Sequence, residues 1–125
     1  MTLVDSNILL DIFTRTPVWW EWSLAQIEDA ALHGPLLIND VIFGETSIRF
    51  PAIEDFEAAL AEAGITVTPM PRMALFLADR SSVLPDFFIG AHAMVERLPL
   101  LTRDTRRYRT YFPTVELIAP AESGR

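Results

Sequence analysis

Short apolar runs alternate with longer amphipathic stretches along this chain. The short runs predict strands at residues 2–5, 35–40, 65–71, 99–104 and 114–119. The longer stretches have apolar residues at helical spacing and predict helices at 7–13, 17–34, 41–48, 52–64, 72–80 and 85–98. A turn is expected through the arginine-rich stretch between the last two strands. Strands separated by helices indicate an α/β fold in three layers, with a mainly parallel central sheet and helices on both faces.

The size and composition of the chain agree with one soluble domain. Of the 125 residues, 50% are hydrophobic and 22% are charged, which is enough to bury a core. We expect one domain over residues 1–120 and a frayed tail over 121–125. The absence of cysteine excludes disulfides and thiolate metal sites. No signal peptide is evident, and no apolar run approaches the roughly 20 residues that span a bilayer. A cytoplasmic protein with no membrane partner is therefore expected.

Carboxylates fall at the predicted ends of two strands and on one predicted helix. Ligands of open α/β sheets bind beyond the carboxyl ends of the strands. Asp5 ends the first strand, and Asp104 ends the fourth. Glu45 shares the apolar stripe of its helix with Ile42 and Ile48. A carboxylate on such a stripe is costly unless it is paired or coordinates a cation, so Glu45 is a candidate ligand.

A fourth carboxylate, Asp86, follows Pro85 at the start of an almost wholly apolar helix. Its position allows two interpretations that are not exclusive: it caps the helix, or it binds a ligand. Two neutral residues, Asn7 and Thr102, are expected to add oxygens at the edge of the sheet where Asp5 lies.

The four carboxylates taken together indicate a metal site. Clustered carboxylates repel one another and remain partly protonated unless cations neutralise them. Ligation by oxygen alone suits Mg²⁺ or Mn²⁺. Such a site can activate water and stabilise the charge that develops when a phosphodiester is cleaved. The alternative is that these acids are only helix caps and surface charges.

The basic residues are few but clustered. The net charge of −7 argues against broad electrostatic binding of nucleic acid, and all ten basic residues are arginine. Four of the ten lie within residues 103–109, at Arg103, Arg106, Arg107 and Arg109. The planar guanidinium suits phosphate, so these arginines are candidates for substrate binding. An arginine-rich composition throughout the genome is the alternative explanation.

All three tryptophans lie within four residues of one predicted helix. Trp19 and Trp22 share a helical face, and Trp20 is rotated about 100° away from it. The helix cannot bury every ring on one core-facing stripe, which favours an interface with a second subunit or a partner protein. The alternative is that all three rings pack within the domain.

Other polar residues are assigned structural roles. Asp40 is expected to cap the helix that follows it, and Asp11 is expected on the solvent side of its helix. Gly44, beside Glu45, is expected to permit a close backbone approach. His92 lies in the middle of a helix among small residues, where a structural role is favoured over that of a general base.

The order of these motifs resembles that of PIN domains, and specifically of VapC-type toxins of bacterial toxin–antitoxin pairs. The matching stretches are "LVDSNILLD" at 3–11, "INDVIFGE" at 38–45, "LPDFFIGAHA" at 84–93, "LLTRDTRRYRTYFP" at 100–113 and the closing "VELIAP". They span nearly the whole chain. One departure is the short segment before Pro85, where related chains often have a longer Arg/Gly-rich loop and this chain has only Arg80.

The resemblance implies a metal-dependent ribonuclease whose acidic quartet matches Asp5, Glu45, Asp86 and Asp104. It also implies a homodimer and inhibition by a cognate antitoxin. A basic residue of that partner is expected to enter the carboxylate cluster, which suits the acidic balance of the chain. Two alternatives stay open: a PIN-like module that binds RNA or protein with little catalysis, and an aspartyl-phosphate phosphotransferase. The absence of lysine and of a second aspartate near Asp5 argues against the latter.

Overall fold

The computed structural model describes residues 1–81 and 84–121. Within them, five strands form one fully parallel sheet in the order β3-β2-β1-β4-β5. The strands are β1 (Thr2–Val4), β2 (Leu36–Ile38), β3 (Ile65–Val67), β4 (Leu100–Leu101) and β5 (Leu117–Ile118). The predicted parallel α/β fold is confirmed. The expected tail, apart from Ala121, and part of the short segment before Pro85 lie outside the described residues.

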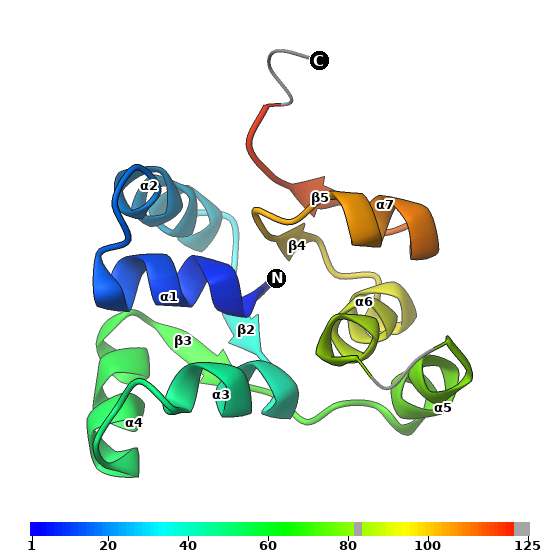
Figure 1. The fold of residues 1–125 in the computed structure, drawn as a ribbon, viewed down its shortest axis with the longest axis horizontal. Helices are drawn as coiled ribbons and strands as arrows, with labels where there is room; N and C mark the ends of the chain where they lie inside the picture. The colour runs from blue at the N-terminus through cyan, green and yellow to red at the C-terminus, as the bar shows by residue number, and fades with distance from the viewer. Residues whose placement is uncertain (82–83, 122–125) are drawn as a thin grey trace.

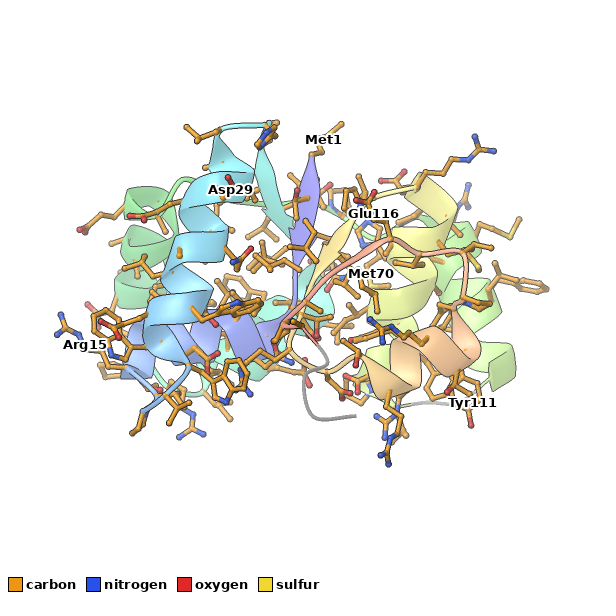
Figure 2. All side chains as sticks on the ribbon, turned by 90° about the horizontal axis from the view of Figure 1, so that it is seen from above. Met1, Arg15, Asp29, Met70, Tyr111 and Glu116 are labelled. Carbon is orange, nitrogen blue, oxygen red and sulfur yellow. The ribbon has the colours of Figure 1, made fainter. Side chains whose placement is uncertain are left out.

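Helices cover both faces of the sheet. They are α1 (Ser6–Thr14), α2 (Trp20–Ala31), α3 (Asp40–Ser47), α4 (Ile53–Glu62), α5 (Arg72–Ser81), α6 (Pro85–Glu96) and α7 (Arg106–Tyr111). Figures 1 and 2 show α1 to α4 gathered on one side of the strands and α5 to α7 on the other. No helix in the described part of the chain is both long and apolar enough to cross a membrane.

The core lies between the sheet and these helices. Leu3, Val4, Ile38, Leu100 and Leu101 are all completely buried, because a parallel strand covered on both faces has no side exposed to water. Each strand is shorter than its apolar run suggested. The pairing ends where the chain turns into a helix, so the polar residues that follow the strands lie just beyond the sheet.

The pairing of β1 with β4 sets the position of the site. Leu3 lies opposite Leu100 and Val4 opposite Leu101, and the backbone N–H of Asp5 donates to the carbonyl of Leu101 at 2.9 Å. The two strands therefore end side by side, and the residues that follow them share one edge of the sheet.

The arginine-rich stretch forms helix α7, so the predicted turn is wrong. Tyr108 and Phe112 are four residues apart and both are buried, so one face of this short segment packs on the core. Arginines on its other faces obscure that spacing in the sequence.

Two expectations about α3 are also wrong. Its N-cap is Asn39, whose side-chain oxygen accepts from the N–H of Ile42 at 2.9 Å, and Asp40 is instead the exposed first residue of the helix. The Asn39 amide nitrogen then donates to Nδ1 of the fully buried His92 at 3.0 Å. This hydrogen bond gives His92 a structural role. The backbone at Gly44 is not approached closely, because nothing lies within 4 Å of a Cβ built there.

Gly90 on α6 is a helical glycine at which an added side chain would collide with a neighbouring ring. A methyl group added there would lie 2.9 Å from Cγ of the Phe112 ring and closer still to the ring edge. Phe112 is only 4% exposed and packs against Phe87, so its ring has little room to move. We expect Gly90→Ala to lower the free energy of unfolding by about 1–3 kcal/mol, measured by urea denaturation.

Gly44→Ala is the matched control, since it also adds one methyl group inside a helix. With no neighbour to displace, it should stabilise the chain by about 0.5–1 kcal/mol through helix propensity. The double variant Gly90→Ala/Phe112→Leu should recover part of the loss. Equal stability of the two alanine variants would contradict the steric argument.

Candidate functional site

Asp5 is the most buried carboxylate of the predicted quartet. It caps α1, and its Oδ1 accepts from the backbone N–H of Ser6 at 2.7 Å. Its Oδ2 accepts from the hydroxyl of Thr102 at 2.8 Å and from the hydroxyl of Tyr108 at 3.1 Å. The side chain is thus held by residues from α1, from the end of β4 and from α7. Asp5 itself is 2% exposed, so its orientation is set by the protein rather than by water.

The environment of Asp5 favours its neutral form. Burial raises the pKa of its carboxyl to about 6, and the hydrogen bond from Thr102 opposes this shift only in part. The negative charge of Asp86 raises the pKa of Asp5 further. Asp5 and Asp86 are therefore close enough to repel each other, although they are 81 positions apart in the sequence.

Glu45 on α3 joins the same cluster. Its Oε1 accepts from the hydroxyl of Ser6 at 2.9 Å, and the same hydroxyl lies 3.4 Å from Oδ1 of Asp5. Burial raises the pKa of Glu45, the hydrogen bond from Ser6 lowers it, and repulsion by Asp86 raises it. Ser6 thus joins two members of the quartet. Sequence reasoning missed it, because its only local signal is its position next to Asp5.

Glu45 lies at the edge of the buried face of α3 rather than at its centre. Ile42 and Thr46 are the buried residues of α3, whereas Ile48 is 78% exposed. The part of the predicted stripe that included Ile48 is therefore wrong. The half-buried position leaves the carboxylate of Glu45 open to a ligand on one side.

Asp86 does not cap its helix. The N-cap of α6 is Leu84, Pro85 occupies the first helical position, and Asp86 is the second. The Oδ2 atom of Asp86 accepts from Nη1 of Arg107 at 2.7 Å, in an ion pair whose side chains are 23% and 40% exposed. Of the two interpretations of Asp86, the capping one is wrong, and in this structure the carboxylate binds an arginine.

Asp104 completes the cluster from the loop after β4. Its side chain is exposed, and its backbone N–H donates to Oγ1 of Thr102 at 3.0 Å. Burial raises the pKa of the Tyr108 phenol, and the negative charges of Asp5, Asp86 and Asp104 raise it further. One buried phenol therefore lies near three carboxylates that come from three different elements.

Asn7 and Thr102 lie where the sequence placed them. The Asn7 amide nitrogen donates to Oγ1 of Thr102 at 3.3 Å, and its oxygen accepts from the backbone N–H of Arg103 at 3.2 Å. These bonds tie the first turn of α1 to the loop after β4. Both residues are polar companions of Asp5 at the same edge.

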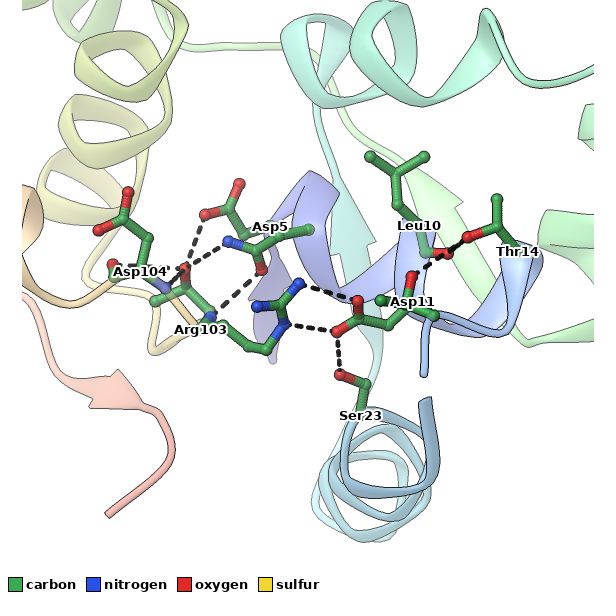
Figure 3. Close-up of polar contacts among 10 residues, drawn as sticks. Asp5, Leu10, Asp11, Thr14, Ser23, Arg103 and Asp104 are labelled. Atoms are coloured by element: carbon green, nitrogen blue, oxygen red, sulfur yellow. Dashed lines mark hydrogen bonds and ion pairs between the residues drawn. The ribbon is translucent and has the colours of Figure 1, made fainter. Parts of the chain in front are cut away.

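Arg103 binds the protein itself (Figure 3). Its Nε and Nη2 atoms donate to the two carboxylate oxygens of Asp11, at 2.6 Å and 2.9 Å. Asp11 is 1% exposed and also accepts from the hydroxyl of Ser23 on α2 at 2.7 Å. The expectation that Asp11 faces solvent is therefore wrong, because α2 packs over that side of α1. The Nε and Nη2 atoms of Arg103 are thus both engaged by Asp11.

The three tryptophans are all half-buried. Trp19 and Trp22 meet edge to face at 5.9 Å, as their shared helical face predicts, and Trp22 packs against the core. Arg103 lies over the Trp19 ring at 4.9 Å, and Arg15 lies over the Trp20 ring at 5.4 Å. The rings are thus partly covered by arginines of the same chain, and each retains some exposed surface.

The family of the chain is established by its sequence over nearly this whole structure. Residues 2–113 match the PIN domain family. The chain belongs to the PIN domain family. PIN domains are typically nucleases and generally use divalent metal ions. No curated protein sequence matched this chain.

Solved structures with the same fold come from toxin–antitoxin systems. VapBC2 from Rickettsia felis, bound to a DNA fragment from its promoter, is 14% identical, with a TM-score of 0.71. The match covers 96% of this PIN domain chain and 98% of the Rickettsia chain. A toxin–antitoxin complex from Klebsiella pneumoniae is 22% identical, with a TM-score of 0.66. The match covers 98% of this chain and 99% of the Klebsiella chain. FitAB bound to an IR36 DNA fragment is 16% identical with a TM-score of 0.64 and covers 100% of both chains. At these identities the likeness shows the fold.

The carboxylates of this PIN domain are suitable ligands for a hard cation, but they are not arranged as a complete metal site. Among the described residues, no group of three or more His, Asp or Glu side chains is arranged to hold a metal ion. Within the cluster, Asp86 is paired with Arg107, and Glu45 accepts a hydrogen bond from Ser6. The donors are oxygens only, and burial together with repulsion by Asp86 raises the pKa values of Asp5 and Glu45, so a bound cation would stabilise their charged forms. This donor chemistry fits a hard divalent cation.

Proposed function

We propose that this PIN domain is a Mg²⁺- or Mn²⁺-dependent endoribonuclease that acts as the toxin of a VapC-type toxin–antitoxin pair. The observation that carries the proposal is the convergence of carboxylates from separate elements. Asp86 repels both Asp5 and Glu45, and Asp104 adds its charge near the same buried Tyr108. Membership of the PIN domain family supports nuclease chemistry for that cluster.

The quartet Asp5, Glu45, Asp86 and Asp104 would hold the cation. When bound, a divalent cation lowers the pKa of a water molecule and offsets charge on the phosphate. Thr102 and Tyr108 orient the carboxylate of Asp5, so that its geometry is set before any ligand arrives.

The substrate contacts are assigned to α7 and to the edge of the sheet. Arg106 and Arg107 bind phosphate, with Arg107 exchanging the carboxylate of Asp86 for a phosphate oxygen of the RNA. Asn7 and Thr102 line the same edge. Arg103, first expected to contact RNA, has a positioning role, because its backbone N–H binds Asn7 and its side chain binds Asp11.

Partner binding is assigned to the tryptophan-bearing surface of α2. Trp19, Trp20 and Trp22 are half-buried within one chain, which leaves aromatic surface for a cognate antitoxin or for the second subunit of a homodimer. The fold-related structures from Rickettsia felis and Klebsiella pneumoniae are toxin–antitoxin complexes, which supports this class of partner. The net charge of −7 suits a basic residue of the antitoxin entering the carboxylate cluster.

Substitution of Asp86 by asparagine tests the metal site. Asp86→Asn keeps the size of the side chain but removes a charged oxygen ligand, so Mg²⁺ or Mn²⁺ affinity should fall at least about 10-fold in calorimetric titration. Cleavage of a generic single-stranded RNA should be lost with it. Thermal stability should fall little, since the ion pair with Arg107 is partly exposed and contributes about 1 kcal/mol at most.

Glu54→Gln is the matched control for Asp86→Asn. Glu54 is likewise the second residue of its helix, α4, and it is exposed. This variant should bind metal and cleave RNA like the wild type. Equal metal affinity in all three proteins would refute the assignment of Asp86 as a ligand.

A second candidate function is a PIN-like module that binds RNA or protein with little catalysis. It is favoured by one observation, the absence of a preformed group of three acidic or histidine ligands among the described residues. Wild-type protein that binds RNA but does not cleave it in Mg²⁺ or Mn²⁺ would select this function.

A further inference from the structure

A cavity of about 270 Å³ opens beside the carboxylate cluster, against helix α7. It is lined by Asp104, Arg106, Arg107, Thr110 and Tyr111. We propose that this cavity is a nucleotide subsite, in which the ring of Tyr111 stacks on one unpaired base of single-stranded RNA and Arg106 binds the adjacent phosphate. The inference rests on the proposed ribonuclease function and adds the group that receives a base next to the cleaved bond.

The ring of Tyr111 is both exposed and held in place. It is the last residue of α7, is 57% exposed and lies at the periphery of the molecule (Figure 2). One side of the ring packs against Phe87, with ring centroids 4.8 Å apart and planes at 55°. Phe87 is itself buried, so it fixes the tyrosine ring while leaving much of the aromatic surface open. Exposed, fixed aromatic rings are the usual platforms for unpaired bases.

The cation of the subsite is Arg106. Arg103 is held by Asp11, and Arg107 is held by Asp86. Arg106 is exposed at the start of α7 and lines the cavity. Thr110 lies one turn along the helix from Arg106, and Tyr111, five residues on, lines the same cavity, so a guanidinium and an aromatic ring face one space. That arrangement presents a positive charge and a π-face together, which are the two groups that a nucleotide requires.

The size and position of the cavity favour single-stranded RNA. Its volume lies just below the roughly 300–1,000 Å³ of sites for drug-sized ligands, which suits one base rather than a base pair. The bases of a duplex are stacked on one another and cannot reach Tyr111. Because Asp104 belongs to both the cavity wall and the carboxylate quartet, a base on Tyr111 would place a neighbouring phosphodiester beside the quartet.

Fluorescence anisotropy with a 5′-fluorescein-labelled RNA hexamer of mixed sequence tests the subsite, with and without Mg²⁺. Tyr111→Leu keeps an apolar contact with Phe87 but removes the π-face, and it should weaken binding about 10- to 100-fold. Tyr111→Phe should bind within about 2-fold of the wild type, since the stacking surface is kept. Arg106→Gln should reduce the magnitude of the salt slope, log Kd against log salt, by about 0.7, the value for one phosphate of a single strand.

Two controls separate stacking from general effects. Phe76→Leu on α5 removes an aromatic ring of similar exposure, 51%, and should leave RNA affinity unchanged. A series of hexamers, each lacking the base at a different position, locates the contact. When the missing base is the one that stacks on Tyr111, the wild type and Tyr111→Leu should bind that hexamer equally. At every other position Tyr111→Leu should bind more weakly than the wild type. That result would locate the stacked base.

The outcomes distinguish this subsite from the proposed function. If the wild type cleaves RNA and Tyr111→Leu binds the hexamer normally, the subsite is wrong and the ribonuclease stands. If the wild type cleaves nothing but Tyr111→Leu loses affinity, the subsite stands without the catalysis. The subsite would be overturned if Tyr111→Leu lost as much affinity for a hairpin duplex as for the hexamer. It would also be overturned if Tyr111→Leu lost binding of a protein partner but still bound RNA normally. If Tyr111→Leu fails to fold, Arg106→Gln and the abasic series decide the question.

Discussion

Asp5→Asn is expected to make the chain more stable and catalytically inactive at pH 7. Burial raises the pKa of Asp5 from 3.8 to about 6, so the folded chain binds this proton more tightly than the unfolded chain does. The stability contributed by the group is fully present below pH 3.8 and is lost as the pH rises through about 6. At pH 7 the buried charge therefore costs roughly 1–3 kcal/mol, at about 1.4 kcal/mol for each pKa unit.

Asparagine removes that cost because it is neutral at every pH. Urea unfolding in a chelator should show the Asp5→Asn chain about 1–3 kcal/mol more stable than the wild type at pH 7. The difference should shrink toward zero at pH 4, where Asp5 of the wild type is mostly protonated. Under the proposed function, the variant should also lose RNA cleavage and the stabilisation by added Mg²⁺.

The exposed Asp55 on α4 supplies the control for Asp5. Asp55→Asn should change stability by less than about 0.5 kcal/mol at both pH values. An Asp5→Asn chain that is less stable than the wild type at pH 7 would contradict the cost assigned to burial. RNA cleavage by that variant at the wild-type rate would contradict the catalytic role of Asp5.

Arg103→Gln is expected to be the most destabilising of these changes. It leaves the carboxylate of Asp11, which is 1% exposed, without its cation. Removing one partner of a buried ion pair costs about 3–5 kcal/mol, because the remaining charge is neither paired nor hydrated. The hydroxyl of Ser23 is a single neutral donor and replaces little of the guanidinium. Urea denaturation at pH 7 measures the loss.

Arg107→Gln is the matched control, since it also breaks an arginine–aspartate pair. That pair is 40% and 23% exposed, and its loss should cost about 1 kcal/mol or less. The double variant Asp11→Asn/Arg103→Gln should be more stable than Arg103→Gln alone, because it removes both charges. Equal losses in the two single arginine variants would show that burial of Asp11 does not govern the effect.

The order of elements was predictable because it depends on local patterns. Apolar runs separated by helical periodicities lead directly to a parallel sheet, whose strands need long crossover connections. Asp5 and Asp104 were found because polar residues that end buried strands meet at one edge. The errors were also local. Asn39 and Asp40 are adjacent residues that both cap helices well, and a pattern alone does not choose between them.

The contacts that shape the site could not be predicted, because they join distant segments. Tyr108 reaches Asp5 across 103 positions of sequence, and Arg103 reaches Asp11 across 92. The sequence of α1 by itself does not indicate that α2 packs over Asp11. The sequence shows which groups can ionise, whereas their partners and hydration depend on how the helices pack.

The sequence by itself therefore determined the parallel α/β architecture and the PIN family, and it predicted the four carboxylates as a site, since each follows from residues close together or from their order. Only the tertiary structure decided that Arg107 occupies Asp86, that Ser6 joins Asp5 to Glu45, and that Tyr111 lies exposed beside Asp104. Long-range packing sets these arrangements, because burial and pairing are properties of the assembled helices and not of any one segment.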